Sequence, residues 1–402
     1  MNRRTFLCSV TLALSVAVSC ARPAPAPILI LVSFDGFRAV DIDRLPVPNL
    51  RALAARGVRA KALIPSFPLL TFPNHYTLVT GLYPEHHGIV GNVIVDPSFP
   101  ERFSMSAKTA KDPRWWGGEP IWVTAIRQGR RAATMFWPGS EVAIGGVRPT
   151  FTVPYDKKMP SADRVTQVLT WLALPEDQRP SFVSLYFEEI DSASHDHGLE
   201  TPEMTAAATH LDAALGQLEA GVTRLGLDDR TTIVVASDHG MAPLSKDRVI
   251  FLDDDIDVST VDIVESTALL ELWPKDGDVD RLYRELHGRH PQLAIYRREE
   301  TPDWLHYRDN PRIPSIVGIP DEGWAVMTHA RFERKFDPAT HGWDSSHPAL
   351  HALFVAAGPA VRRGVVVEPF ANVHVYDFLC AVLKLTPAPN DGNPAVTRAF
   401  LR

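Results

Sequence analysis

Three segments of the chain place an aspartate directly after a strongly apolar run. Asp35 follows Val-Ser-Phe, Asp191 follows Phe-Glu-Glu-Ile, and the pair Asp238-His239 follows Val-Ala-Ser. His195 lies four residues after Asp191, which is one turn of a helix or a compact loop, so both side chains can converge on one ion. Carboxylate oxygens together with imidazole nitrogens favour zinc or a similar divalent metal, whereas calcium and magnesium sites more often use oxygen alone. The set exceeds the ligands that one tetrahedral ion needs, and it therefore favours two metals.

A threonine that could act as a nucleophile lies at the end of a loop rich in turn residues. Thr71 precedes a segment that Pro73 and Gly81 bracket as a short helix. The N–H groups and the dipole at a helix N-terminus favour an anionic oxygen or a phosphate. A free hydroxyl is a poor nucleophile at neutral pH, but coordination to a divalent metal would favour its alkoxide. Most threonines at such a position are only helix caps, so this hypothesis depends on the metal ligands.

Four apolar runs predict buried strands that position these residues. The runs are short and rich in Ile, Val, Leu and Phe, and they cover residues 27–34, 182–187, 232–236 and 351–356. A helical pattern lies between them, with Leu211, Leu215, Leu218, Val222 and Leu225 at spacings of four and three. Strands that alternate with helices predict an α/β fold with a mostly parallel central sheet and helices on both faces. In such a sheet ligands bind beyond the carboxyl ends of the strands.

The composition of the chain predicts its division into units. The chain has 402 residues, of which 45% are hydrophobic, so it can bury a large core. Residues 242–329 are more charged and contain scattered prolines, and we expect them to form an inserted cap subdomain. The catalytic core is then residues 26–241 and 330–402, and residues 1–25 are an export signal and linker. A net charge of −7 argues against a general nucleic-acid-binding protein, so we expect no nucleic-acid polymer as a partner.

The N-terminal residues resemble an export signal. Arg3-Arg4 and the apolar stretch after them resemble the twin-arginine type. The sequence Ala-Val-Ser before Cys20 resembles a lipobox, in which Cys20 would be lipidated and would tether the protein to a bacterial membrane. Ordinary cleavage and release is the alternative, so we expect an exported protein that is either periplasmic or a membrane-tethered lipoprotein. Either outcome leaves Cys380 alone, without a disulfide framework.

Several longer motifs then carry a resemblance to a known family. They are TFPN at residues 71–74, GLYP at 81–84, HGIVGN at 87–92 and SDHGM at 237–241. In this order they resemble the nucleotide pyrophosphatase/phosphodiesterase family of the alkaline phosphatase superfamily, and the chain is similar to an exported bacterial member over its whole length after the signal. The resemblance implies an alkaline phosphatase-like fold and a hydrolase that uses two zinc ions.

The resemblance also implies a ligand set for each ion. Thr71 would be both nucleophile and ligand, and one zinc would be held by Asp35, Thr71, Asp238 and His239. The second zinc would be held by Asp191, His195 and His341. The histidine motif at residues 341–345 reads HGWDS, where the family usually has Tyr or Phe followed by Asp-Asn, and His347 and His351 are alternatives to His341. Ser194 replaces the usual glycine before His195, but the four-residue spacing is intact.

Aromatic residues near these motifs indicate a slot for a planar base. Phe72, Tyr155 and Tyr186 are the candidates, and stacking on such a ring stabilises a bound base by about 1–3 kcal/mol. The alternative is that Tyr186 belongs to the core and Tyr155 only anchors a loop. The resemblance implies Phe72 and Tyr155 as the two faces of the slot, and Asn92 as a contact to a non-bridging phosphate oxygen. We expect the backbone N–H of Phe72 to assist Asn92.

The function implied is hydrolysis of nucleotide phosphodiester or pyrophosphate bonds. A covalent phosphothreonine would form and break down, with release of a nucleoside 5′-monophosphate. A glycerophosphodiester or lysophospholipid head group is an alternative substrate, because aromatic rings also bind a choline cation. Phosphonate hydrolysis and a non-enzymatic, metal-stabilised binding protein are further alternatives. The intact Thr71 argues against the binding protein, and the sequence predicts no oligomeric state.

Overall fold

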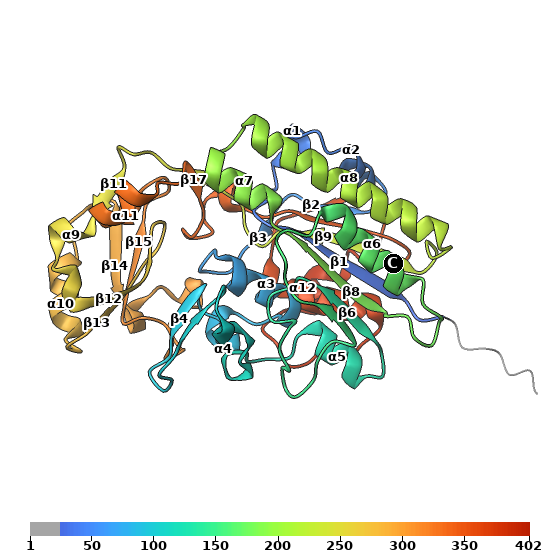
Figure 1. Ribbon diagram of the computed structural model, residues 1–402, viewed down its shortest axis with the longest axis horizontal. Helices are drawn as coiled ribbons and strands as arrows, with labels where there is room; N and C mark the ends of the chain where they lie inside the picture. The colour runs from blue at the N-terminus through green and yellow to red at the C-terminus, as the bar shows by residue number, and fades with distance from the viewer. Residues whose placement is uncertain (1–24) are drawn as a thin grey trace, which may run out of the picture.

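A computed structural model of the chain describes residues 25–402. The predicted export signal and Cys20 lie outside the described residues. Within the described range no helix is both long and apolar enough to cross a membrane. Figure 1 shows a larger α/β unit that contains both chain ends of the described range and a smaller unit at one end of the molecule.

Three adjacent parallel strands form the centre of the main sheet. β1 (Ile28–Phe34) lies between β8 (Phe182–Phe187) and β9 (Thr231–Ala236), and it is parallel to both. Every residue of these three strands is buried, which explains their unbroken apolar sequences. The register pairs Phe34 with Phe187 and Ser33 with Ala236, so the three strands end at the same edge of the sheet.

Five further strands extend the sheet on both sides. The strand order is β19-β2-β18-β9-β1-β8-β6-β7. The added strands are β2 (Val58–Ala60), β6 (Ala132–Met135), β7 (Phe151–Val153), β18 (Phe354–Ala357) and β19 (Val365–Val367). Only β18 pairs antiparallel, with β9 and with β2. The prediction of a mostly parallel sheet is confirmed, although the last predicted strand begins at Phe354 and not at residue 351. Because β18 is antiparallel, the chain enters it at the edge where β1, β8 and β9 end.

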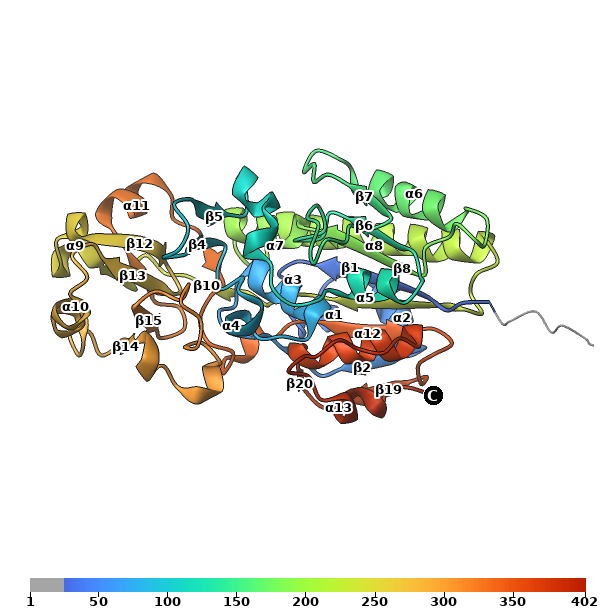
Figure 2. The ribbon, with the colours of Figure 1, turned by 90° about the horizontal axis from the view of Figure 1, so that it is seen from below.

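Helices cover both faces of this sheet (Figures 1 and 2). One face carries α6 (Ser161–Leu172), α7 (Glu189–His197) and α8 (Pro202–Arg224), and the other carries α3 (Thr71–Thr80), α5 (Ile121–Arg127) and α12 (Val375–Leu383). The predicted leucine pattern lies in α8, which begins where the Thr201 side chain accepts a hydrogen bond from the Met204 N–H and Pro202 occupies the first turn. The shorter helices of the core are α1 (Asp41–Arg44), α2 (Pro48–Ala55), α4 (Pro84–His87) and α13 (Pro394–Arg398).

Short strands pair with each other in the connecting segments of the core, and single turns of 3-10 helix occur in both units. β3 (Leu63–Ile64) pairs with β20 (Phe370–Ala371), and β4 (Val93–Val95) pairs with β5 (Arg102–Ser104). Single turns of 3-10 helix lie at Lys108–Lys111, Pro113–Trp115, Val258–Thr260, Arg298–Glu300, Asp303–Leu305, Pro348–Leu350 and Asn372–His374.

The smaller unit has its own sheet and its own core. The chain leaves the main unit through β10 (Ala242–Pro243) and returns through β17 (Ala339–Thr340), which pair with each other. Between them an antiparallel sheet has the order β12-β13-β15-β14 and a separate apolar cluster includes residues from Ile250 to Val326. The elements of this unit are β11 (Val249–Phe251), α9 (Leu252–Asp255), β12 (Val261–Ser266), β13 (Leu270–Pro274), α10 (Val279–Leu286), β14 (Leu293–Arg297), β15 (Ile316–Pro320), β16 (Ala325–Met327) and α11 (His329–Arg334). We call residues 244–338 the inserted unit.

A buried hydrogen-bonded group joins the inserted unit to the core. The Tyr307 hydroxyl lies 2.7 Å from the carbonyl oxygen of Val90 and 2.5 Å from Oε1 of Glu271, and Tyr307 and Glu271 are both buried. A single hydroxyl has one proton and cannot donate to both oxygens. A protonated Glu271 resolves this, because it donates to Tyr307 while Tyr307 donates to Val90. Burial raises the pKa of Glu271 to about 8, in agreement with this arrangement.

We expect Glu271 to make the stability of the protein depend on pH. Its pKa of about 8 in the folded chain exceeds its ordinary value of 4.5. Between these two pH values the unfolded chain loses the proton while the folded chain keeps it, so the free energy of unfolding falls as pH rises through this window. Glu271→Gln keeps a neutral donor toward Tyr307 and removes the titration. The melting temperature of this variant should therefore decrease less between pH 5 and pH 8.5 than that of the wild-type protein.

The matched control is Glu299→Gln, which changes an exposed glutamate of the same unit. Its melting temperature should follow the wild-type pH dependence. The prediction is wrong if Glu271→Gln and Glu299→Gln show the same dependence.

Candidate active site

The predicted acidic residues meet at the edge where the central strands end. Asp35 directly follows β1, Asp191 lies in the first turn of α7 after β8, and Asp238 and His239 follow β9. Gly36 allows the strand ends to approach closely. It has a φ of +71°, and a Cβ at this position would lie 3.1 Å from Cα of Asp191. Its N–H donates to Oδ1 of Asp238 at 3.2 Å, which links the end of β1 to the end of β9.

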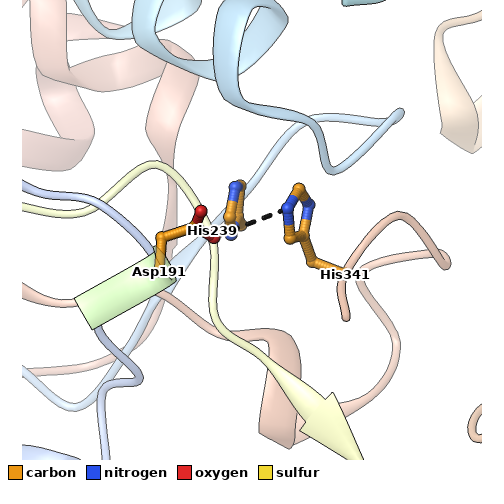
Figure 3. Close-up of side chains that lie close together, drawn as sticks. All are labelled: Asp191, His239 and His341. Atoms are coloured by element: carbon orange, nitrogen blue, oxygen red, sulfur yellow. Dashed lines mark ion pairs between the residues drawn. The ribbon is translucent and has the colours of Figure 1, made fainter. Parts of the chain in front are cut away.

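One group of possible metal ligands comprises Asp191, His239 and His341 (Figure 3). Each offers one ligand atom, and these atoms all lie within 4.8 Å of one another. Nε2 of His341 lies 3.6 Å from Oδ1 of Asp191, and Nε2 of His195 lies 3.4 Å from the same oxygen. The rings of His239 and His341 stack with centroids 3.6 Å apart. The four side chains therefore converge on one volume.

Backbone carbonyls fix the tautomers of two of these histidines. Nδ1 of His341 lies 2.7 Å from the carbonyl oxygen of Leu69, and Nδ1 of His239 lies 3.0 Å from that of Gly240. A carbonyl only accepts, so Nδ1 carries the proton in both rings and Nε2 offers its lone pair toward the carboxylates when the ring is neutral. Burial lowers the pKa of His341 to about 3, and the adjacent charge of His239 lowers it as well. His341 is therefore neutral at physiological pH.

A second group of possible ligands comprises Asp35, His75 and Asp238. Oδ2 of Asp238 lies 3.0 Å from Nε2 of His239, and Nε2 of His239 lies 3.6 Å from Oδ1 of Asp35. His239 thus contacts both groups. The two groups share one continuous patch at the edge of the sheet, which agrees with the sequence-based expectation of adjacent metal ions.

His75 was not among the residues that the sequence analysis selected. Its Nδ1 lies 2.8 Å from the carbonyl oxygen of Thr71 and 3.2 Å from Oδ2 of Asp238, and its Nε2 lies 2.7 Å from the hydroxyl of Ser33. The Thr71 carbonyl oxygen only accepts, so Nδ1 is the donor in this bond and Nε2 is left to accept from Ser33. Both nitrogens of His75 therefore have hydrogen-bond partners, and the ring lies beside Oδ2 of Asp238. The available signal was its position one helical turn after Thr71.

The buried atoms of this patch fit a bound cation. Among the buried atoms that have no hydrogen-bond partner within residues 25–402, four belong to this patch: Oδ1 of Asp35, Oδ1 of Asp191, Oδ2 of Asp238 and Nε2 of His239. An unpaired buried polar group costs about 1–3 kcal/mol, so this many at one place require a common partner. Oxygen and imidazole nitrogen donors together fit divalent zinc or a similar metal.

The charges of the patch also show in the pKa values of its carboxylates. Burial raises the pKa of Asp35 well above its usual range, and the charges of Asp238 and Asp191 raise it further. Burial alone would raise the pKa of Asp191, but the adjacent charge of His195 is the main cause that outweighs burial and brings this pKa to about 2. A divalent cation would offset the burial and the repulsion that raise the pKa of Asp35, and it would thereby favour the ionised carboxylate.

The helix predicted after Thr71 is confirmed. α3 begins at Thr71 and ends before Gly81, whose φ of +69° gives the helix a left-handed cap. The backbone N–H of Phe72 donates to Oδ1 of Asn92 at 3.0 Å. Asn92 accepts this N–H here, so the expected contact of the Phe72 N–H with a phosphate oxygen stays a prediction. This bond also fixes the Asn92 amide, whose NH₂ group remains available as a donor.

The three predicted aromatic residues have different surroundings. Phe72 is half-buried and packs against Phe103 and Trp116, with centroids 5.9 and 6.1 Å away. Tyr155 is 47% exposed. Tyr186 is buried, and its hydroxyl donates to Oδ2 of Asp35 at 2.6 Å, so its phenol supports a carboxylate of the patch. The centroid of its ring lies 6.3 Å from that of Tyr155. This position agrees with the alternative that placed Tyr186 in the core.

The two alternative histidines lie on other partners. Nδ1 of His347 lies 2.7 Å from Oε2 of Glu322, and Nε2 of His351 lies 3.1 Å from the carbonyl oxygen of Ser345. His341 is the histidine of this segment that contacts Asp191.

Comparison with known proteins places this site in a family. Residues 29–344 match the model of the type I phosphodiesterase/nucleotide pyrophosphatase family. The chain belongs to this family. The resemblance drawn from the sequence motifs is thereby confirmed, and so is the α/β fold. The solved structure of an inactive threonine-to-alanine variant of murine ectonucleotide pyrophosphatase/phosphodiesterase 5 in complex with AMP is similar to this chain. The TM-score is 0.89 and the identity is 34%, covering 94% of this chain and 100% of that chain.

Curated relatives of this type I phosphodiesterase family member include enzymes of different lengths. It is 40% identical to a venom phosphodiesterase of Crotalus durissus collilineatus over 374 residues, which are 90% of this chain and 45% of the relative. It is 36% identical to the bis(5′-adenosyl)-triphosphatase of Xenopus laevis, covering 93% of this chain and 82% of the relative. The chain thus spans about half the length of the venom phosphodiesterases that it matches.

For this family member we expect His341→Ala to lower the metal content. The variant removes a neutral imidazole that faces Asp191, so the bound divalent metal should fall by about one ion per chain after dialysis against trace zinc. Elemental analysis of the purified protein by mass spectrometry measures this content directly. His347→Ala is the matched control, because it removes a histidine that pairs with Glu322, and it should keep the wild-type content. Equal metal content in the two variants would contradict the assignment of His341.

Proposed function

We propose that this protein hydrolyses phosphodiester or pyrophosphate bonds of small nucleotides and releases a nucleoside 5′-monophosphate. One observation carries the proposal. Buried carboxylate and imidazole atoms that have no hydrogen-bond partner within residues 25–402 gather at this edge of the sheet. At the same edge His75 contacts both Asp238 and the carbonyl oxygen of Thr71, the first residue of α3. The names of relatives support it, since they include venom phosphodiesterases, a bis(5′-adenosyl)-triphosphatase and a murine protein in complex with AMP.

Two zinc ions are the cofactors that we propose. Asp191, His195 and His341 would hold one ion. Asp35, Asp238, His239 and the Thr71 hydroxyl would hold the other. When bound, the ions neutralise the carboxylates and stabilise negative charge on the oxygens of the reacting phosphate. Support comes from the mixed oxygen and nitrogen donors of both groups and from the fixed Nδ1–H tautomers of His239 and His341.

The protein groups then perform a double displacement at phosphorus. Oγ1 of Thr71 gives its proton to solvent and attacks phosphorus in line, so a bond between Oγ1 and phosphorus forms as the bond to the leaving oxygen breaks. Water next attacks the phosphorus of this intermediate. The bond between Oγ1 of Thr71 and phosphorus breaks, and Oγ1 regains a proton. The NH₂ group of Asn92 donates to a non-bridging phosphate oxygen, because Oδ1 of the same amide is used by Phe72.

The base of the nucleotide would stack between Phe72 and Tyr155. Phe72 directly follows the nucleophile and packs on Phe103 and Trp116, so its ring is held firmly. Tyr155 is exposed enough to receive a flat ligand. Stacking accepts any base, so we propose specificity for nucleotides in general and no preference among bases.

We also propose that the protein is exported, as a periplasmic protein or a lipoprotein tethered through Cys20. The support is the basic and apolar pattern of the N-terminal residues and the sequence before Cys20. Mass spectrometry of the membrane fraction tests the tether, because a lipidated Cys20 adds the mass of its acyl chains.

Replacement of Thr71 is the decisive test of the chemistry. Thr71→Ala should lower kcat/KM for a nucleoside 5′-p-nitrophenyl phosphate by about 1,000-fold or more, because the covalent route is lost. Thr71→Ser keeps a hydroxyl and should retain measurable activity. Rapid acid quenching of the wild-type reaction should trap the nucleoside monophosphate group on the peptide that contains Thr71. Full activity of Thr71→Ala would overturn the proposal.

A substrate panel tests the proposed specificity. We expect kcat/KM for the nucleotide diester to exceed the values for lysophosphatidylcholine and p-nitrophenyl monophosphate by about 100-fold, which corresponds to about 2.7 kcal/mol in the transition state. Preference for lysophosphatidylcholine would instead assign the aromatic slot to a choline head group. If the protein hydrolysed only a phosphonate, its substrate would be a compound with a carbon–phosphorus bond and not a diester.

A further inference from the structure

A buried ion pair lies next to Phe136 and Tyr186, which together with Tyr155 form what we call the aromatic wall of the site. Neither residue of the pair is a proposed metal ligand. Arg164 of α6 is 1% exposed and Glu188, which follows β8, is 6% exposed. Nη1 of Arg164 donates to Oε2 of Glu188 at 2.7 Å, and Nη2 donates to Oε1 at 2.9 Å. Such a fork fixes the plane of the guanidinium group. Arg164 also donates through Nε to the carbonyl oxygen of Met159 at 3.0 Å.

The fixed guanidinium group contacts two residues of the wall. Nη1 of Arg164 donates to the carbonyl oxygen of Tyr186 at 3.1 Å. Cζ of Arg164 lies 4.9 Å from the ring centroid of Phe136, within the range of a cation–π contact. Phe136 follows β6 and has a φ of +63°, a left-handed conformation that is unfavourable for a bulky side chain. The contact with Arg164 therefore helps to hold Phe136 in a conformation that the backbone alone does not favour.

Both residues that Arg164 contacts lie against Tyr155. The rings of Phe136 and Tyr155 meet edge to face, with centroids 5.2 Å apart and planes at 77°, and the Tyr186 ring lies 6.3 Å away. The backbone N–H of Tyr155 donates to Oε1 of Glu141 at 3.0 Å, but this bond leaves the phenol ring free to turn. The orientation of the half-exposed phenol ring therefore depends on Phe136 and Tyr186, and through them on Arg164.

A buried ion pair is weak evidence for a stabilising role. The loss of hydration of both charges offsets most of their attraction, and apolar residues of similar volume are often as stable or more stable. Apolar residues would not reproduce the geometry of this pair. Arg164 donates two hydrogen bonds to Glu188 and one to the Tyr186 carbonyl, and its guanidinium group lies over the Phe136 ring.

We propose that Arg164 and Glu188 are positioning residues that hold Tyr155 in the orientation that stacks on the base of the substrate. The pair then sets the affinity for nucleotide substrates without changing the chemical step at Thr71. This inference rests on the proposed function, since it requires that Phe72 and Tyr155 bind a base.

The test replaces the whole pair, so that no buried charge is left alone. Arg164→Met/Glu188→Leu should raise KM for a nucleoside 5′-p-nitrophenyl phosphate about 10-fold and leave kcat within about twofold. Methyl p-nitrophenyl phosphate has the same leaving group and no base, and its kcat/KM should change by less than about twofold. A role in folding alone would lower the activity on both substrates together. The melting temperature of each variant shows directly whether it is folded.

A second ion pair supplies a matched control. Arg230 and Glu176 form a similar fork, with N–O distances of 2.7 and 2.6 Å, next to the start of β9 and away from the candidate ligands. Arg230→Met/Glu176→Leu should leave KM for both substrates unchanged. An equal rise of KM in the two double variants would overturn the inference.

Combination with Tyr155→Ala distinguishes positioning of this ring from other effects. Tyr155→Ala alone should raise KM for the nucleotide diester. Addition of Arg164→Met/Glu188→Leu to Tyr155→Ala should then raise KM by less than about twofold, because the ring that the pair positions is already absent. Multiplicative effects would overturn the inference.

The outcomes also separate this inference from the proposed function. If the wild-type protein shows no preference for the nucleotide diester over methyl p-nitrophenyl phosphate, the proposed base binding fails and the inference fails with it. If the wild-type protein prefers the nucleotide diester and Arg164→Met/Glu188→Leu keeps the wild-type KM, only the inference fails.

Discussion

The site depends on one constraint: the buried carboxylates at one edge of the central sheet must have their negative charge compensated. Asp35, Asp191 and Asp238 bring three carboxylates together where β1, β8 and β9 end, and each has an oxygen that is buried without a hydrogen-bond partner within residues 25–402. Such a group is costly unless cations or donors surround it. The structure supplies part of this compensation through imidazole groups on several segments, and the remaining lone pairs fit divalent metal ions.

The topology of the sheet explains how a distant segment completes the cluster. β18 is antiparallel to β9, so the chain that leads into β18 passes the same edge at which the parallel strands end. His341 lies in this chain, and its Nδ1 is anchored on the carbonyl oxygen of Leu69, just before α3. One imidazole thus connects the return from the inserted unit to the segment that carries Thr71. This hydrogen bond holds a proposed metal ligand beside the segment that leads into the proposed nucleophile.

The inserted unit is linked to the site in a second way. Tyr307 donates to the carbonyl oxygen of Val90, two residues before Asn92, whose amide accepts from the N–H of Phe72. Glu85 reinforces this joint, because its buried carboxylate accepts hydrogen bonds from the backbone N–H groups of Arg308 and Asp309. The inserted unit therefore holds the segment that positions Asn92, in addition to packing around a core of its own.

Local sequence determined the parts of this protein that depend on short-range order. Continuous apolar runs predicted β1, β8 and β9 to within one residue, and the spacing of leucines predicted α8. Proline and glycine predicted the helix that begins at Thr71. Pairs of polar residues within one segment, such as Asp191 with His195, were predicted for the same reason, because four residues make one helical turn.

Tertiary structure alone decided which atoms meet across long separations. His75 contacts Ser33 across 42 residues and Asp238 from another strand, and no local pattern encodes these contacts. The choice of His341 over His347 required the contacts of the folded chain, which place His341 against Leu69 and Asp191 and His347 against Glu322. The use of the Phe72 N–H by Asn92 required the path of the loop after α4. The fork between Arg164 and Glu188 likewise depends on the packing of α6 against β8. Side chains far apart in sequence are brought together by strand order and packing, which are properties of the whole fold.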